Sequence, residues 1–135
     1  MVIRYENQLP NKYAFHDLFE TTGWNVKYAF TPDDLFKAIS HSYFMVCAYE
    51  GENLVGYGRV ISDGVYQTFI GDMIIHPDFQ QKGIGSRILT ELIEKCQKDG
   101  MKWIQLTSAK GKMGFYQKFG FEARPDDAAG MQKYL

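Results

Sequence analysis

The sequence feature that most constrains the fold is the change from an apolar run to a helix between residues 72 and 85. The apolar run stops at Pro77, a short polar loop follows, and Gly83 and Gly85 then open the helix. The first turn of a helix has backbone N–H groups without partners, and its dipole favours negative charge. Because neither glycine has a Cβ atom, a bulky anion can approach the main chain closely. This segment is therefore predicted to hold a pyrophosphate group.

Two well-known glycine-rich loops do not fit this segment. The dinucleotide fingerprint requires a third glycine three residues after the second, and that position is Ile88. The Walker loop requires Lys and then Ser or Thr directly after its last glycine, whereas Gly85 is followed by Ser86 and Arg87. Two glycines alone would also suit an ordinary helix start. The pyrophosphate interpretation therefore depends on the whole order of strand, proline, glutamine and glycine pair.

Hydrophobic periodicity and turn residues predict the other elements. Apolar residues recur at helical spacing from Ile84 to Cys96, and Gly100 ends that helix. Thr31 and Pro32 begin another helix with a capping side chain and a proline in the first turn. Two pairs of strands, 44–49 with 54–61 and 121–123 with 131–134, are predicted hairpins. The remaining predictions are strands at 2–6, 66–75 and 103–107 and helices at 10–20 and 112–119.

Composition excludes several classes of function. The 135 residues are predicted to form one domain over 1–135, and the net charge of −1 gives no basic field for nucleic acid. No run approaches the roughly 20 apolar residues of a membrane span, and the N-terminus lacks the core of a signal peptide. Cys47, Cys96 and the three histidines lack the spacing of a metal site. We therefore expect a cytoplasmic location, buried free thiols, and no metal, membrane or nucleic-acid partner.

Two blocks of the sequence resemble the GCN5-related N-acetyltransferase (GNAT) family. Residues 80–85 read Gln-Gln-Lys-Gly-Ile-Gly, which fits that family's acetyl-CoA loop of Gln or Arg, two residues, Gly, one residue, and Gly or Ala. Residues 114–121 read Gly-Phe-Tyr-Gln-Lys-Phe-Gly-Phe and look like its second block, so the resemblance covers residues 67–121. It implies an α/β (α+β) fold with a mixed, mostly antiparallel sheet of about six to seven strands and about four helices. A splayed parallel pair, formed by 66–75 and 103–107, would lie at the centre of the sheet.

The resemblance implies an N-acetyltransferase with acetyl-CoA as cosubstrate and direct transfer to a primary amine of a small molecule. The pantetheine arm would pair with the strand at 73–75, and the pyrophosphate would lie on the N–H groups near 81–86. Many family members have an Asn where this chain has Ala109, so Ser108 or Lys110 is expected to substitute for it. The expected cofactor-binding residues are Met73, Ile74, Ile75, Gln80, Gln81, Lys82, Gly83, Ile84, Gly85, Ser86, Ser108 and Lys110.

The resemblance also places Tyr116 at the position of the family's frequent general acid. A phenol is a reasonable proton donor to a departing thiolate, because pKa values of roughly 8.5 for a thiol and 10 for a phenol are not far apart. A Tyr that only packs the core is the structural alternative. The amine must first lose a proton, and Asp72 is the candidate base. A structural role for Asp72, a role for His76, and a water chain remain open as alternatives.

Two other functions are consistent with the sequence. One is acetylation of a protein lysine or N-terminus, which requires an open peptide groove. The other is a non-catalytic module that binds acetyl-CoA. The tail around Gly130 and Met131 resembles small-amine acetyltransferases most, including aralkylamine and amino-sugar types. The two C-terminal strands would also allow a homodimer through pairing of exposed strand edges.

Overall fold

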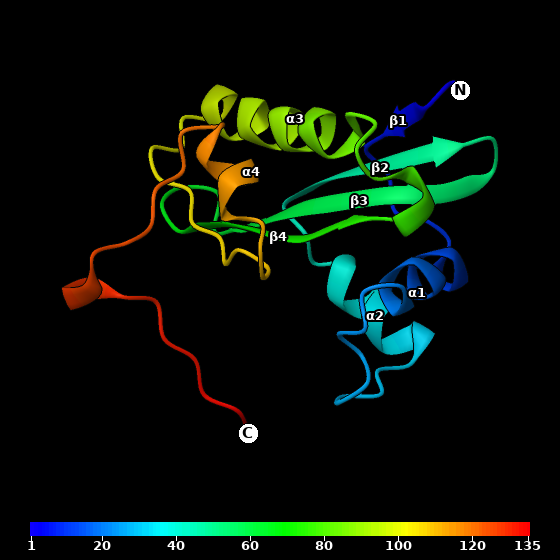
Figure 1. The fold of residues 1–135 in the computed structure, drawn as a ribbon, viewed down its shortest axis with the longest axis horizontal. Coiled ribbons are helices and arrows are strands. Elements are labelled where there is room, and N and C mark those ends of the chain that lie inside the picture. The colour runs from blue at the N-terminus through cyan, green and yellow to red at the C-terminus, as the bar shows by residue number, and fades with distance from the viewer.

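The computed structural model describes residues 1–135 and contains one antiparallel sheet with helices on both faces (Figure 1). The strands are β1 (Arg4–Glu6), β2 (Phe44–Glu50), β3 (Asn53–Ser62) and β4 (Thr68–Ile75), and they neighbour one another in chain order. Gly51 joins β2 to β3 with a positive φ of 57°. The hairpin predicted at this position is present.

Helices α1 (Lys12–Glu20) and α2 (Pro32–Ile39) cover one face of the sheet. The Asn11 side chain caps α1 by accepting hydrogen bonds from two N–H groups of its first turn. Thr31 caps α2 and forms a reciprocal capping box with Asp34. The buried residues of this layer are Phe15, Leu18, Phe19, Leu35, Ile39, Met45, Cys47, Leu54, Tyr57 and Ile74.

Helix α3 (Ile84–Lys98) covers the opposite face of the sheet. It packs on the strand side chains that alternate toward this face. Gly58 lets the helix approach β3 closely, because a Cβ atom there would lie 2.6 Å from Met73 Sδ and 2.8 Å from Ile88 Cγ2. The buried residues of this layer are Val46, Ala48, Val55, Val60, Ile70, Ile84, Ile88, Leu89, Leu92, Cys96 and Met101.

Strand β4 contains a β-bulge opposite Gly58. The register shifts between Tyr57 and Arg59 of β3, so Asp72 and Met73 of β4 together oppose a single residue. Asp72 adopts a left-handed backbone with a φ of 52°. A bulge of this kind bends its strand and changes the direction of the side chains that follow. The bend lies just before β4 reaches the loop that leads into α3.

The predicted parallel strand pair exists only as one bridge. Phe69 of β4 pairs with Gln105 in parallel orientation. Ile70 N–H donates to Gln105 O, and Gln105 N–H donates to Thr68 O, both at 2.9 Å. No strand forms at 103–107. Because the bulge bends β4 beyond this bridge, the two segments share no further backbone hydrogen bond.

The predicted total of six to seven strands is wrong, since the structure has four. The expected hairpin of 121–123 and 131–134 is absent. After helix α4 (Met113–Gln117), the chain runs outward from the domain with a single 3-10 turn, η2 (Asp126–Ala128) (Figure 1). Residues 122–135 are all exposed. A two-stranded hairpin needs packing against other elements to be stable, and this segment has only isolated side-chain contacts with the domain. Arg124 donates to Gln105 Oε1 at 3.2 Å, and Lys27 Nζ lies 3.4 Å from the centroid of the Tyr134 ring.

The number of α-helices is four, as predicted, and none of them is long and apolar enough to cross a membrane. Cys47 and Cys96 are buried free thiols, as the sequence suggested. Burial raises the pKa of Cys47 to about 12. This thiol therefore stays protonated and unreactive at neutral pH.

Candidate functional site

A cavity of about 580 Å³ lies where four parts of the chain meet. Its walls come from residues 73–75 of β4, from 77–86 between β4 and the first turn of α3, from 109–118 around α4, and from 21–24 after α1. The volume falls within the range of about 300–1,000 Å³ that is usual for small-molecule sites. The β4–α3 segment that the sequence singled out therefore forms one side of a ligand-sized cavity.

The start of α3 offers a row of free hydrogen-bond donors. The backbone N–H groups of residues 81–86 have no acceptor within the protein. Gln81 and Gly83 adopt left-handed backbone conformations, with φ of 59° and 84°, and Gly83 is the N-cap of the helix. Successive N–H groups in such a turn form an anion-binding concavity, and the helix dipole adds positive potential. Nothing lies within 4 Å of a Cβ atom built on Gly83, so the turn is open to a bulky anion.

Gln80 connects this turn to the outer edge of β4. Its Nε2 donates to Ile75 O at 3.1 Å. His76 N–H donates to Val55 O of β3 at 2.8 Å, so strand alternation turns the backbone groups of Ile75 the other way. Ile75 also lines the cavity. Its N–H is therefore an unpaired donor at the cavity edge.

Tyr116 comes from α4 and lies between the cavity and a second, smaller one of about 200 Å³. Its ring packs edge-on against Phe115, with centroids 5.1 Å apart, and against Phe121 at 6.1 Å. Burial raises the pKa of its phenol above the usual 10. The hydroxyl thus stays protonated at neutral and mildly alkaline pH.

The cavity is positively charged. Lys112 and Lys118 are its charged lining residues, and no Asp, Glu or His side chain lines it. This charge favours ligands with phosphate or other anionic groups. It also means that no lining side chain has the usual chemistry of a general base near neutral pH.

Asp72, the candidate base, does not line this cavity. Its carboxylate accepts a hydrogen bond from Arg59 Nε at 2.6 Å, and the two side chains are 23% and 14% exposed. Arg59 also donates to Ala38 O at 3.0 Å, so the pair connects the bulge of β4 to β3 and to the end of α2. This position matches the structural alternative for Asp72, and its role as the base stays a prediction.

Nine of the twelve expected cofactor-binding residues line the cavity together with Tyr116. Lys82 and Lys110 do not, and Ser108 lines the smaller cavity instead. His76 caps the short helix η1 (Pro77–Phe79), where its Nδ1 accepts from Asp78 N–H at 3.1 Å. The nine that come together are Met73, Ile74, Ile75, Gln80, Gln81, Gly83, Ile84, Gly85 and Ser86.

Sequence reasoning missed the wall formed by Thr21, Thr22 and Trp24. Thr22 Oγ1 accepts from Trp24 N–H at 3.0 Å, and the indole packs edge-on against Phe19 with centroids 5.8 Å apart. The sequence predicted only a loop here, because the contact with β4 and α3 joins segments far apart in the chain. The one local signal is an aromatic residue inside a polar loop.

The rest of this loop is held by a buried amide, Asn25. Its Nδ2 donates to Phe30 O at 2.9 Å and to Glu20 at 2.6 Å, and its Oδ1 accepts from Phe30 N–H at 2.7 Å. Asn25 is only 6% exposed. Because both ends of the amide are satisfied, the loop keeps one shape without support from a ligand.

The fold and this site together define an acyltransferase that uses acetyl-CoA. The profile of the acetyltransferase (GNAT) family matches residues 12–121, and the chain belongs to that family. The resemblance stated from the two sequence blocks is thus confirmed.

Curated relatives agree with this assignment. The chain is 31% identical over 128 residues to an uncharacterized N-acetyltransferase, ycf52, of Porphyra purpurea, with 92% of this chain and 72% of that protein covered. It is 38% identical over 77 residues to GCN5-related N-acetyltransferase 1, chloroplastic, of Arabidopsis thaliana, with 57% of this chain and 39% of that protein covered. The cytoplasmic location expected from the sequence stays a prediction, since a relative is named as chloroplastic.

Solved structures share the fold. A probable acetyltransferase of unknown function from meticillin-resistant Staphylococcus aureus has a TM-score of 0.88 at 23% identity, and 99% of this chain and 100% of that chain are covered. The PaiA N-acetyltransferase of Thermoplasma acidophilum, solved in complex with coenzyme A, has a TM-score of 0.73 at 16% identity, with 92% of both chains covered.

Proposed function

We propose that this protein transfers the acetyl group of acetyl-CoA directly to a primary amine of a small molecule. One observation carries the proposal: the unpaired N–H groups at 81–86 and the phenol-bearing Tyr116 belong to the same cavity of about 580 Å³. The anion-binding turn can hold the pyrophosphate of CoA, and the protonated phenol can act as a general acid when the thioester is cleaved.

The donor half of the cavity fits coenzyme A chemically. The free N–H groups of 81–86 would bind the pyrophosphate, and Lys112 and Lys118 would add positive charge. Residues 73–75 present an unpaired strand edge that suits the amide groups of the pantetheine arm. A related fold has been solved with coenzyme A, which supports the same ligand class here.

The catalytic half consists of groups that act on a developing charge. The thioester supplies an activated acyl carbon and a thiolate leaving group. The Ile75 N–H would donate to the acyl oxygen, and Tyr116 would deliver its proton to the departing sulfur. Positioning of the two reactants in the cavity would lower the activation free energy further, by at most about 7–11 kcal/mol. No lining side chain removes the proton of the amine, so water performs that step.

The acceptor half is the wall of Thr21, Thr22 and Trp24. Both threonine hydroxyls already donate to carbonyls of α1, at 2.6 and 2.7 Å, so toward a ligand they act as acceptors. The indole adds contact with its ring. This short wall supports a small-molecule acceptor over a peptide, which would need an extended groove.

Two measurements test this proposal. Calorimetry with CoA and acetyl-CoA measures binding, and thiol release over a panel of small amines and lysine peptides measures transfer. We expect saturable binding and turnover with a small amine. If only peptides are acetylated, the acceptor is a protein and not a small molecule. If neither CoA nor acetyl-CoA binds at millimolar concentration, the whole proposal is overturned.

A pair of glycine variants locates the binding site. In Gly85→Ala the added Cβ would lie 3.6 Å from Phe115 Cζ, an ordinary contact, and alanine favours the helix by up to about 1 kcal/mol. The methyl group would nonetheless stand beside the free N–H groups. We expect folding stability to be kept and the Kd for CoA to rise about tenfold, which is about 1.4 kcal/mol. Gly114→Ala makes the same change in α4 outside the cavity lining and serves as the control.

A further inference from the structure

Two lysines line the larger cavity, and neither has an ionic partner in the chain. Lys112 is the N-cap of α4, and Lys118 is its C-cap. None of the seven ion pairs of the structure includes either side chain. Because no Asp or Glu side chain lines the cavity, both ammonium groups are free to act on the charge of a bound ligand. Their positions relative to Tyr116 differ.

Lys112 lies one helical turn before Tyr116, on the same face of α4. Its carbonyl accepts hydrogen bonds from Phe115 N–H at 3.1 Å and from Tyr116 N–H at 3.4 Å, so the helical spacing begins at this lysine. Side chains four residues apart in a helix have Cβ atoms only about 5–6 Å apart. Lys118 comes two residues after Tyr116 and therefore projects from another side of the helix. The ammonium group that shares a helix face with the phenol is thus that of Lys112.

Packing holds α4 against the end of β4. A Cβ atom built on Gly85 would lie 3.6 Å from Phe115 Cζ and 3.7 Å from Ile75 Cγ1, so these two side chains meet at the first turn of α3. The Ile75 N–H is the unpaired donor that the proposed function assigns to the acyl oxygen. A thioester bound there would therefore have its sulfur between the end of β4 and the face of α4 that carries Lys112 and Tyr116.

The acid–base properties of the phenol leave negative charge on the departing sulfur. A thiol has a pKa of roughly 8.5 and a phenol of roughly 10, and burial raises the pKa of Tyr116 further. The proton therefore favours the phenol over the thiolate by more than about thirtyfold at equilibrium. Charge thus develops on the sulfur before the proton of Tyr116 arrives. A fixed cation stabilises such a charge most effectively when it is already in place.

We propose that Lys112 stabilises the thiolate of CoA as it departs, whereas Lys118 acts on the phosphate groups. This inference rests on the proposed function and assigns one step within it. The acceptor nitrogen forms a bond to the acyl carbon, the C–S bond breaks, and its electron pair stays on the sulfur. The surplus proton of the nitrogen goes to water. The thiolate takes a proton from Tyr116, which recovers one from water, while the Lys112 ammonium keeps all of its protons.

The first experiment requires binding but no turnover. The carbon-13 shift of CoA labelled next to its sulfur reports the pKa of the bound thiol. An opposite charge within about 4–6 Å lowers the pKa of an acid, so we expect this value to be lower by about 1 in the parent chain than in Lys112→Gln. Equal values in the two complexes would overturn the inference.

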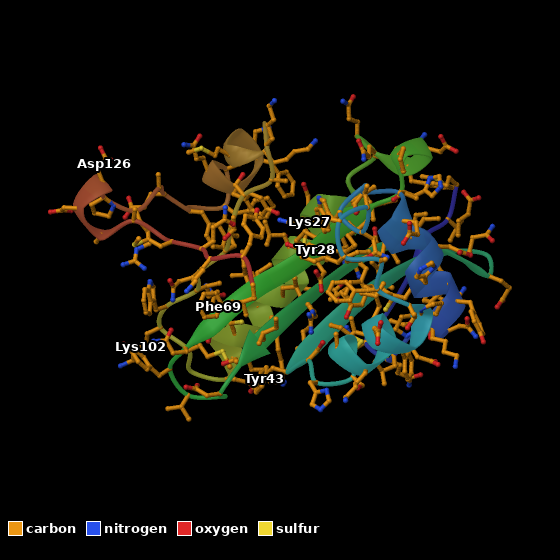
Figure 2. The ribbon with its side chains drawn as sticks, turned by 90° about the horizontal axis from the view of Figure 1, so that it is seen from below. Lys27, Tyr28, Tyr43, Phe69, Lys102 and Asp126 are labelled. Carbon is orange, nitrogen blue, oxygen red and sulfur yellow. The ribbon has the colours of Figure 1, made fainter.

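Lys102→Gln is the matched control for this titration. Lys102 is exposed and lines neither cavity. Figure 2 shows it near Phe69 at the start of β4, whereas the larger cavity lies at the other end of that strand. The bound thiol should therefore have the same pKa in Lys102→Gln as in the parent chain. An equal rise in both glutamine variants would show an effect of net charge and overturn a specific role for Lys112.

A donor without phosphate groups distinguishes the sulfur from the pyrophosphate as the target of Lys112. S-acetyl-pantetheine keeps the thioester and its amide groups but lacks the pyrophosphate and the nucleotide. We expect Lys112→Gln to lower kcat about three- to tenfold with this donor and with acetyl-CoA alike. Lys118→Gln should instead raise the Kd for acetyl-CoA. If the loss in Lys112→Gln appears with acetyl-CoA alone, Lys112 only binds phosphate and the inference is overturned.

Rescue by Lys112→Arg separates the charge from the fold. Because position 112 is exposed, both variants should keep the circular dichroism of the parent chain, and the arginine variant should recover most of the lost kcat. An arginine variant as slow as the glutamine variant would contradict a role for the charge. If the parent chain binds CoA but the thiol pKa does not depend on Lys112, this inference fails and the proposed function stands. If the parent chain does not bind CoA, both are overturned.

Discussion

The phenol of Tyr116 is a donor without an acceptor in this structure. Its ring is fixed by Phe115 and Phe121, yet the hydroxyl makes no hydrogen bond within the chain, although its surroundings are dry enough to raise its pKa. A polar atom placed in this way is available to a ligand group. The aromatic contacts therefore serve to hold the hydroxyl in position.

Tyr116→Phe removes only this hydroxyl and keeps the packing of the ring. We expect kcat to fall about ten- to a thousand-fold, as for loss of a general acid, while the Kd for acetyl-CoA stays nearly the same. Thiol-release kinetics and calorimetry measure the two quantities. Tyr13→Phe, on the exposed side of α1, is the matched control, and an unchanged kcat in Tyr116→Phe would remove this residue from the mechanism.

Asp72→Asn tests whether the Asp72 carboxylate is structural. Asparagine tolerates the left-handed backbone at this position, but the change leaves the half-buried Arg59 without its ion pair. We expect the free energy of unfolding to fall by about 1–3 kcal/mol, with kcat changed far less than in Tyr116→Phe. Denaturant titration and kinetics measure both. A loss of turnover at full stability would instead identify Asp72 as the base.

At the scale of elements, the contact between β3 and α3 depends on the absence of a side chain at Gly58. In Gly58→Ala the new methyl group would overlap Met73 Sδ at 2.6 Å and Ile88 Cγ2 at 2.8 Å. We expect the free energy of unfolding to fall by about 1–3 kcal/mol because of overpacking. Because Met73 lines the cavity, a rise in the Kd for acetyl-CoA should accompany it.

The matched control is Gly71→Ala in β4, where nothing lies within 4 Å of the added Cβ atom. Its stability should stay within about 0.5 kcal/mol of the parent chain. Thermal and denaturant unfolding of both variants measure the difference. Equal stability of the two would contradict the packing seen between α3 and the sheet.

Elements with local signals were predictable from the sequence. The cap at Thr31, the periodicity of α3 and the β2–β3 hairpin each depend on a few neighbouring residues. The strands expected at 103–107, 121–123 and 131–134 did not form, because a strand exists only where another strand pairs with it. Their residues have the composition of strands, but the chain offers them one bridge at Gln105 and no other pairing.

The candidate site likewise contains residues that could be predicted from local sequence patterns and residues that could not. The loop at 80–86 was found because glycine and glutamine spacing is a local pattern, and all of its residues except Lys82 line the cavity. The wall of Thr21, Thr22 and Trp24 was missed, because it reaches the site only through tertiary packing. The bulge at Asp72 was missed for a related reason, since it is defined by the pairing of two strands. A position on β4 was therefore insufficient to tell which way this carboxylate lies.

At the scale of the whole molecule, the charge of the cavity predicts its pH dependence. An alkylamine has a pKa near 10, so its neutral fraction rises about tenfold for each pH unit below that value. No carboxylate or imidazole lines the cavity to remove the proton. The raised pKa of Tyr116 keeps its phenol protonated over the same range. If this phenol is the proposed acid, activity should not fall until the pH passes that raised value.

We therefore expect kcat/KM to rise about tenfold per pH unit from pH 6 toward the pKa of the amine itself. Two acceptors with different amine pKa values give the measurement, because the bend in each profile should follow the acceptor. A bend at one common pH for both amines would instead indicate a titrating group of the protein. Solvent viscosity and a second buffer serve as controls.

The hydrogen bonds of Asn25 have a further consequence for how this enzyme changes its preferences. They secure the α1–α2 loop without help from β4 or α3, so residues 21–24 can be altered while the grip on the acetyl donor is untouched. If the proposed acceptor wall is right, substitution of Thr21, Thr22 and Trp24 should change which amine is accepted and leave the binding of acetyl-CoA unchanged.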